Sequence, residues 1–295
     1  LLNRDLPEEE RIPLIEKFRK MYETMDFYVL YNRFLKKEGY QTLPRRPLEK
    51  RKLRYEDVYP ILYLKYRLSR QAERSNIKHL VIDEMQDYSL LQYLIIRRMF
   101  SCKMTILGDR AQTMADQQQD VLQFLPGIFG KDLRRIEMRK SYRNTVEIAS
   151  YAANLIGVTD LELFERHGMP VLERDVTDLE AALREAVDTL LPDEKTYETA
   201  AVIVPDEKTA ERAYLILRGI LAEKDFDCGK RLSWLNRDSS SFKKGLTVTT
   251  FYLAKGLEFD QVFSIFPKDE KREIMMQAQY IAATRALHEL RVYHI

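Results

Sequence analysis

Short apolar runs that alternate with amphipathic helical segments constrain the fold of this chain more than any other feature. From residue 78 onward we predict a strand over 80–82, a helix over 90–100 and a strand over 104–107. Further strands are expected over 201–204, 246–251 and 262–266, with helices between several of them. Strands separated by helices pair in parallel, and helices cover both faces of the sheet. The sequence therefore predicts an α/β protein with mostly parallel sheets.

The first 54 residues follow a different pattern. Apolar residues three or four positions apart over 8–38 predict one long amphipathic helix that ends at Gly39. Residues 40–54 carry prolines and a cluster of Arg and Lys side chains. This composition indicates a solvated linker, and the alternative is an arm that contacts phosphates.

Two helix starts are marked by local chemistry. Pro60 is expected in the first turn of a helix that begins near Asp57, where the missing N–H costs nothing. Asn144 and Glu147 are spaced as in a capping box, and the helix that they open is expected to end at Gly157.

The composition is that of an ordinary globular protein. Hydrophobic residues make up 45% of the 295 positions, charged residues 32%, and the net charge is +2. A nucleic-acid surface would therefore be a local patch. Two cysteines cannot form a disulfide framework, and four histidines argue against a zinc site. Because no apolar run approaches the ~18 residues of a membrane span and no signal peptide is recognisable, we expect a cytoplasmic protein without a membrane partner.

Length and the first residue bear on domain organisation. A chain of 295 residues suggests two domains. The sequence starts with Leu1 instead of Met, so we expect a fragment of something longer. The oligomeric state cannot be inferred from the sequence.

Two carboxylates follow the first predicted strand directly. The apolar residues 80–82 lead into Asp83 and Glu84, as when a buried parallel strand delivers acids to the end of a sheet. In nucleotide hydrolases with this pattern, one acid holds Mg²⁺ and its neighbour polarises the attacking water. The alternative is an acidic pair at the start of a helix, so the interpretation depends on the other motifs.

Five segments, in one order, resemble the motor of superfamily 1 helicases of the UvrD/Rep type. They are VIDEMQD at 81–87, LGDRAQ at 107–112, SYRN at 141–144, TFYLAKGLEFD at 250–260 and AATRA at 282–286. The resemblance covers roughly residues 55–295 and is highly specific, because all five motifs occur in the family's order.

The resemblance implies a fold and a division into domains. It implies two RecA-like lobes, the first incomplete, with mostly parallel sheets and a helical N-terminal segment. Residues 1–54 would be a helical arm or part of an inserted subdomain, followed by the basic linker. Residues 55–132 would be the C-terminal part of the first lobe, and residues 133–295 the second lobe without a large inserted domain.

It also implies ATP hydrolysis, with ATP and Mg²⁺ as cofactors. Asp83 would hold Mg²⁺, and Glu84 would act as the base toward the hydrolytic water. Gln112 would sense the γ-phosphate. Arg143 and Arg285 would stabilise charge on the transferring phosphoryl group. The alternative is a surface ion-pair partner for Arg143 and a charge on a helix face for Arg285, each of little energetic weight.

Three more residues would bind the nucleotide. Tyr142 would stack on adenine, Glu258 would accept a hydrogen bond from the ribose, and Gly256 would permit close backbone approach. The alternative for Tyr142 is core packing. In the family arrangement the acids and Gln112 lie on one lobe and both arginines on the other, so that nucleotide closes the cleft. Asp109 is interpreted as a structural residue.

The chain departs from the family pattern in several ways. It contains no phosphate loop of the form G-x-x-x-x-G-K-[ST], so as it stands we expect weak ATP binding and feeble hydrolysis. The interval 143–255 has no room for the extra domain of processive helicases. Residues 113–117 contain no aromatic ring to stack on single-stranded bases, and Tyr252 stands where many relatives have His.

These departures resemble the HelD-like, helicase IV-like branch of the family, whose members act on RNA polymerase. The first functional hypothesis is therefore a HelD-like ATPase that remodels or recycles RNA polymerase on nucleic acid. The second is a 3′-to-5′ DNA helicase or translocase with DNA as its partner. The third is a non-catalytic interaction module that keeps the nucleotide-lobe fold.

Overall fold

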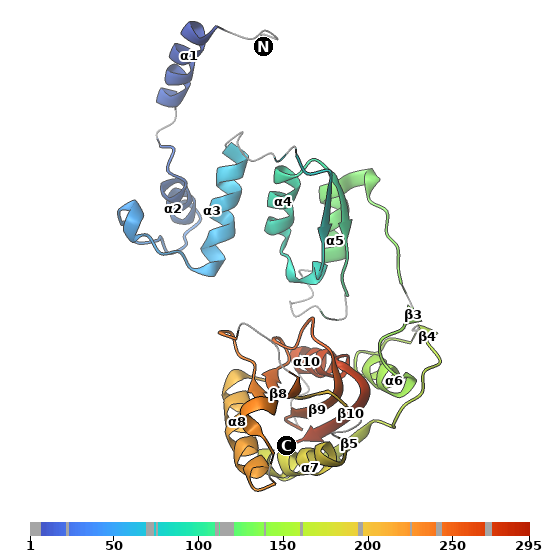
Figure 1. Ribbon diagram of the computed structural model, residues 1–295. Helices are drawn as coiled ribbons and strands as arrows, with labels where there is room; N and C mark the ends of the chain where they lie inside the picture. The colour runs from blue at the N-terminus through green and yellow to red at the C-terminus, as the bar shows by residue number, and fades with distance from the viewer. Residues whose placement is uncertain are drawn as a thin grey trace. The chain divides into compact units, whose positions relative to one another are not determined.

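The computed structural model describes residues 7–21, 24–68, 74, 76–109, 112, 121–138, 140–159, 162–193, 197–224, 226–239, 244–268 and 273–295. The chain forms two compact units. The first comprises residues 1–108 and 115–133, and the second comprises residues 109–114 and 134–295. Both contain helices and parallel strands, so the predicted α/β class is confirmed (Figure 1). None of the described helices has the length and hydropathy of a membrane span.

The first unit is mainly helical and carries a two-stranded sheet. Its elements are α1 (Glu8–Met21), α2 (Phe27–Lys37), η1 (Leu48–Lys50), α3 (Tyr55–Leu68), β1 (His79–Ile82), η3 (Met85–Asp87), α4 (Leu90–Met99), β2 (Lys103–Ile106), α5 (Val121–Phe129) and η6 (Gly130–Asp132). Strands β1 and β2 pair in parallel and end together, with Ile82 opposite Ile106. A small core of Ile82, Tyr93, Val121 and Leu125 packs α4 and α5 against this sheet.

The single helix predicted over 8–38 is wrong, because Asp26 starts a second helix. Its carboxylate accepts hydrogen bonds from the backbone N–H groups of Tyr28 and Val29, which caps α2. The same carboxylate forms a bidentate pair with Arg51 of the basic segment, at 2.9 and 2.7 Å. The predicted end of the helix at Gly39, where φ is +78°, is confirmed.

The helix expected to begin near Asp57 begins two residues earlier, at Tyr55. Pro60 therefore lies in the second turn and not in the first, so that part of the prediction is wrong. Asp57 is buried and accepts a hydrogen bond of 3.0 Å from the hydroxyl of Tyr31, which joins α3 to α2.

The second unit is built on a six-stranded sheet. Its elements are β3 (Lys140–Ser141), α6 (Val146–Leu155), β4 (Glu162–Leu163), β5 (Leu172–Asp175), α7 (Leu179–Asp193), β6 (Thr199–Val204), α8 (Glu207–Ala222), α9 (Cys228–Arg231), β7 (Leu232–Trp234), β8 (Gly245–Thr250), β9 (Phe259–Phe266), α10 (Glu273–Ala283) and β10 (Ala286–His294). The sheet order is β5-β10-β9-β6-β8-β7, and every pairing in it is parallel.

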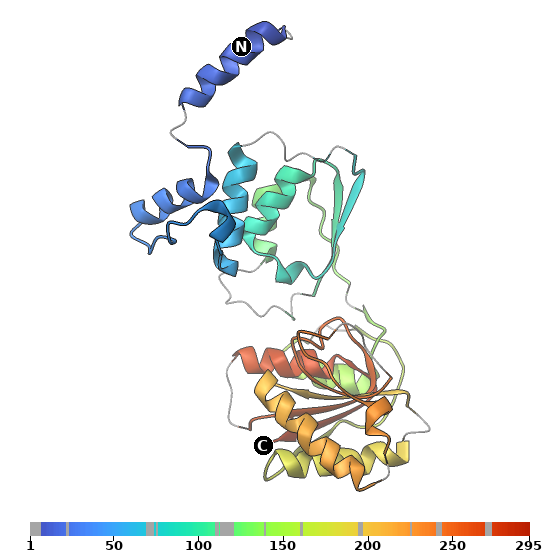
Figure 2. The same cartoon turned by 60° about the vertical axis from the view of Figure 1, so that its left-hand side comes forward.

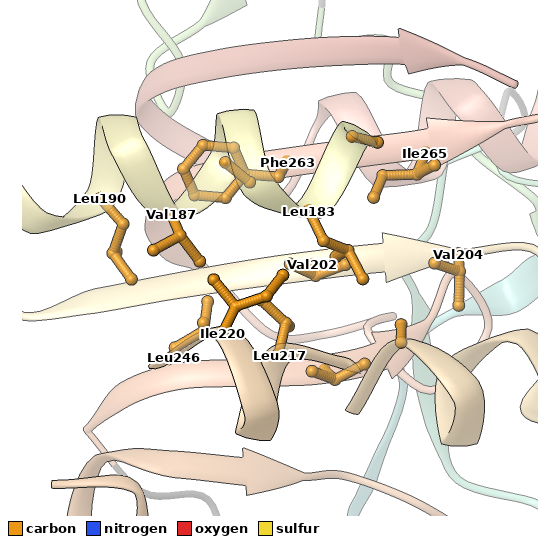
Figure 3. Packing of buried hydrophobic residues seen from close by; sticks show 14 of the residues in the cluster. Leu183, Val187, Leu190, Val202, Val204, Leu217, Ile220, Leu246, Phe263 and Ile265 are labelled. Atoms are coloured by element: carbon orange, nitrogen blue, oxygen red, sulfur yellow. The ribbon is translucent and has the colours of Figure 1, made fainter. Parts of the chain in front are cut away.

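Helices cover both faces of this sheet, and the central strand β6 shows how. Ala200, Val202 and Val204 face one core with α7 and α8, whereas Ala201 and Ile203 face the other with α6 and α10. Because every second residue enters a different core, the strand is a continuous apolar run and does not alternate with polar residues. Figure 3 shows the first core, with side chains of α7 and α8 meeting on β6. Figure 2 shows the two helix layers of this unit.

The start of α6 differs from the prediction by one residue. Thr145, and not Asn144, is the N-cap residue, and its hydroxyl accepts a hydrogen bond from the backbone N–H of Ile148. The proposed capping box of Asn144 and Glu147 is therefore wrong. Asn144 is buried and donates to a distant backbone segment instead. The predicted end of the helix near Gly157, where φ is +66°, is confirmed.

Candidate functional site

The acidic pair lies at the carboxyl edge of the small sheet in the first unit. Asp83 is exposed and Glu84 half-buried, directly after the last residue of β1. The backbone N–H of Glu84 donates to Asp83 Oδ1 at 2.8 Å. The segment after β2 runs alongside, because the N–H of Met85 donates to the carbonyl of Leu107 at 2.8 Å. The two parallel strands thus deliver their following residues to one edge. The expectation that the first of these strands is buried is wrong, because Val81 is 60% exposed.

Glu84 has a strained backbone. Its φ and ψ are both 51°, and within the described part of the chain it is the only non-glycine residue with positive φ. This left-handed conformation is unfavourable for a residue with a Cβ and persists where the surroundings enforce it. The buried Gln86 donates from Nε2 to Glu84 Oε2. Gln86 was not among the predicted site residues, although its place two residues after Glu84 in the same motif was the available signal.

Gly108 is a second residue whose role the sequence analysis missed. A Cβ at this position would lie 2.4 Å from Met85 Cγ and 2.7 Å from the backbone nitrogen of Met85. It would also lie 2.5 Å from Gln86 Oε1. Only glycine therefore fits against the segment that carries the acids.

In the second unit, strand pairing brings two of the predicted residues together. Phe259 of β9 pairs with Ala286 of β10, and the N–H of Phe259 donates to the carbonyl of Arg285 at 2.9 Å. Glu258 and Arg285 immediately precede these paired residues. They are therefore neighbours at the amino edge of the sheet. Ligand sites of open α/β sheets commonly lie at the carboxyl edge, so this half of the candidate site departs from that rule.

Arg143 joins the same edge. Its Nε lies 2.7 Å from Glu258 Oε1, and both side chains are nearly half exposed. The backbone around Arg143 is bound to the start of β10, because Asn144 Nδ2 donates to the carbonyl of Ala286 at 2.6 Å. Arg166 donates to the carbonyls of Arg143 and Leu287. The structure thus gathers Arg143, Glu258 and Arg285 from three distant segments.

The guanidinium group of Arg285 donates mainly to backbone carbonyls. Only 2% of it is exposed, and its guanidinium donates to the carbonyl of Ile281 at 3.2 Å and to that of Leu257 at 3.3 Å. A third bond reaches the hydroxyl of Thr284 at 3.1 Å. Arg285 therefore holds the loop that ends in Glu258. The alternative of an exposed charge on a helix face is wrong.

Gln112 connects to this group through Asp109. Gln112 Nε2 donates to Asp109 Oδ2 at 2.9 Å, and the hydroxyl of Tyr280 donates to the same oxygen at 3.1 Å. Burial and the charge of Asp109 raise the pKa of Tyr280, while Arg285 and Arg143 act in the opposite direction. The family arrangement places Gln112 with the acids. Here residues 109–114 group with the second unit, because Tyr280 of α10 binds Asp109.

Tyr142 and Gly256 complete the predicted set. Tyr142 is 59% exposed, so the alternative that it packs in the core is wrong. Its ring centroid lies 5.6 Å from that of Phe164, and Lys140 Nζ lies 5.5 Å from the Tyr142 centroid. Gly256 has a φ of +80° and open space where a Cβ would stand. Both features are compatible with an approaching planar ligand.

The donor set fits magnesium that is bound mainly through phosphate and water. The described residues contain no group of three or more His, Cys, Asp or Glu side chains suited to hold a metal ion. Asp83 offers one exposed carboxylate next to Glu84. Magnesium keeps several waters and commonly takes only one or two carboxylates together with substrate phosphates. Asp83 could hold the ion in that manner.

Comparisons with solved structures found several similar chains. The C-terminal domain of a possible DNA helicase from Lactobacillus plantarun WCFS1 is 24% identical, with a TM-score of 0.40, over 52% of this chain and 88% of that one. The PRRSV helicase is 16% identical, with a TM-score of 0.42, over 75% of this chain and 36% of that one. The Arterivirus nonstructural protein 10 helicase, in complex with DNA, is 14% identical, with a TM-score of 0.41, over 76% of this chain and 41% of that one.

No curated protein matches the chain. The family of the UvrD/REP helicase N-terminal domain matches residues 3–114. That range contains the acidic pair, Gly108 and Gln112. The match is to the N-terminal domain of that family and covers less than half of the chain.

Proposed function

We propose that this chain is part of an ATP-hydrolysing helicase motor. The observation that carries the proposal is the gathering of Arg143, Glu258 and Arg285 at one edge of a parallel sheet. In the same unit Gln112 binds Asp109, which binds Tyr280, five positions before Arg285. Two cations at one edge of the sheet and an amide in the same unit match the needs of phosphoryl transfer, in which catalysis is mostly positioning and charge stabilisation.

In this proposal each residue has one task. Asp83 holds Mg²⁺, and Glu84 acts as base toward the attacking water. Arg143 and Arg285 stabilise the charge on the transferred phosphoryl group, and the amide of Gln112 acts at the γ-phosphate. Tyr142 stacks on adenine. Glu258 accepts a hydrogen bond from the ribose, and Gly256 leaves room for close approach.

The proposed division of the chain is that of the motor. Residues 55–132 are the C-terminal part of the first RecA-like lobe and residues 133–295 the second. Residues 1–54 are a helical arm with a basic linker. The six-stranded parallel sheet with helices on both faces supports this assignment for the second lobe.

For the partner, we propose RNA polymerase on nucleic acid, as in the HelD-like branch. The described residues between Arg143 and Lys255 form α6 to β8 of the second unit, which supports a motor without the large inserted domain of processive helicases. The ring-free segment 113–117 supports it from the sequence, although it lies outside the described residues. The second candidate is a 3′-to-5′ DNA helicase, which the family match over residues 3–114 favours.

The test uses the full-length gene product. ATP hydrolysis is measured alone, with single-stranded DNA and with RNA polymerase, for the wild type, for Glu84→Gln and for the exposed control Glu49→Gln. We expect Glu84→Gln to bind ATP normally but to lose most turnover. Glu49→Gln should match the wild type.

The substrate is tested separately. Capture of RNA polymerase without strand separation is the expected result. Robust 3′-to-5′ unwinding would assign the second candidate instead. Absence of hydrolysis in the wild type, with every partner present, would contradict the motor.

A further inference from the structure

One oxygen of Asp109 accepts two hydrogen bonds. Its Oδ2 receives the amide Nε2 of Gln112 at 2.9 Å and the hydroxyl of Tyr280 at 3.1 Å. Tyr280 comes from α10, 171 positions away in the sequence. The two donors therefore meet at a single carboxylate, and the position of Gln112 depends on a tyrosine of a distant helix.

This arrangement decides the orientation of the Gln112 amide. A carboxylate only accepts hydrogen bonds, so the NH₂ end of the amide must face Asp109. Gln112 is 7% exposed, and its Oε1 is buried without a hydrogen-bond partner among the described residues. A buried acceptor without a donor is unfavourable. The site therefore lacks a donor that reaches Gln112 Oε1.

The surroundings indicate which donor would fit. Arg285 follows Thr284, whose backbone N–H donates to the carbonyl of Tyr280 at 3.0 Å, and Arg143 lies at the same edge of the sheet as Arg285. Their guanidinium groups have acceptors of their own in Glu258, Ile281 and Leu257. A phosphate oxygen cannot donate to Oε1, whereas a water molecule can.

We propose that Tyr280 and Asp109 are positioning residues that turn the Gln112 amide so that its oxygen accepts a hydrogen bond from the water that attacks the terminal phosphate of ATP. This rests on the proposed function. The water oxygen bonds to the γ-phosphorus while the proton that it loses passes to Glu84, the base of the proposed function. The bond from that phosphorus to the β–γ bridging oxygen breaks with its electron pair left on the oxygen, and ADP leaves. Gln112 orients the water and takes no proton. This role differs from γ-phosphate sensing, in which the NH₂ group would face the phosphate.

The first test is a double-mutant cycle in the full-length gene product. Tyr280→Phe removes only the hydroxyl. We expect kcat for ATP hydrolysis to fall by about tenfold, with KM for ATP unchanged. In a Gln112→Ala background, Tyr280→Phe should have no further effect, because the residue that it positions is gone. Tyr151→Phe is the matched control, since that hydroxyl also donates to a carboxylate, Glu173, in the same unit.

The second test exchanges donor and acceptor. Gln112→Glu alone should lose activity, because two carboxylates then face each other. Adding Asp109→Asn restores a donor toward position 112 and leaves an oxygen there for water, so activity should recover in the double variant. If Tyr280→Phe fails to fold, this donor–acceptor exchange still tests whether Asp109 positions the Gln112 amide.

The outcomes are distinct. The positioning role is overturned if the effects of Tyr280→Phe and Gln112→Ala on kcat are additive and activity does not recover in the Gln112→Glu, Asp109→Asn double variant. If the wild type still hydrolyses ATP in that case, the motor function stands. A wild-type protein that does not hydrolyse ATP would overturn both.

Discussion

Arg143 Nε lies 2.7 Å from Glu258 Oε1, so two residues that were predicted to bind different parts of a nucleotide bind each other. Both side chains are more than 40% exposed. Exposed ion pairs contribute about 0–1 kcal/mol to stability. A nucleotide could therefore break the ion pair and bind both side chains at little cost in stability. We expect this of a site whose side chains bind each other when no ligand is present.

From this pair we predict a separation of stability from activity. Arg143→Ala should change the free energy of unfolding by less than about 1 kcal/mol and should lower kcat for ATP hydrolysis by about a hundredfold or more. Arg184→Ala is the control, because Arg184 forms a similarly exposed pair with Glu180 at 2.7 Å. Denaturant unfolding and steady-state kinetics are the measurements. Equal activity of the two variants would remove Arg143 from the site.

From the strained backbone of Glu84 we predict that two variants with the same loss of turnover differ in stability. Glu84→Gly and Glu84→Ala both remove the carboxylate and the bond from Gln86, so both should lose hydrolysis. Glu84→Gly should be more stable than Glu84→Ala by about 1 kcal/mol, because only alanine keeps a Cβ in the left-handed region. Thermal unfolding of the two variants measures the difference. If alanine is as stable as glycine, this position carries no strain.

From the close packing of Gly108 we predict that a larger residue displaces the segment that carries Asp83 and Glu84. Gly108→Ala should lower the free energy of unfolding by about 1–3 kcal/mol, because the new methyl group would overlap Met85 and Gln86. It should also reduce turnover by displacing Glu84. Gly127→Ala is the matched control, since a Cβ there meets nothing within 4 Å and the position is helical. That variant should be unchanged or more stable by about 1 kcal/mol. Equal unfolding curves for the two variants would contradict the contact.

Glu147 predicts a dependence of stability on pH. Its hydrogen bond with His167, together with that from the backbone N–H of Gly168, lowers the pKa of the carboxyl from 4.5 to about 2. A carboxyl whose pKa is lower in the folded state stabilises the fold above its unfolded value and loses that effect as pH falls through the folded value. The stability difference between wild type and Glu147→Gln should therefore be full above about pH 4.5 and vanish towards pH 2. A difference that is constant over this range would contradict the assignment.

Local patterns predicted much of the secondary structure. The strand before Asp83, the helix from Leu90 and strands β6, β8 and β9 were recognisable, because periodicity, Gly and Pro act over a few residues. The edge strands β5 and β7 and the strand β10 were not predicted. The same local reading failed at Asp26, where a cap divides one apolar pattern into two helices. It also failed at Asn144, whose amide binds the carbonyl of Ala286, 142 positions away.

The chemical types of the candidate site came from the sequence: an acid pair after an apolar strand, a glutamine after the next strand, and arginines in two later motifs. Their arrangement came from tertiary structure. The register of β9 with β10 makes Glu258 and Arg285 neighbours at the amino edge of the sheet, and Tyr280 binds Asp109 from a distant helix. These contacts depend on strand register and helix packing between segments more than 20 residues apart. No local pattern encodes them, because periodicity reports which face of an element is buried and not which element covers it.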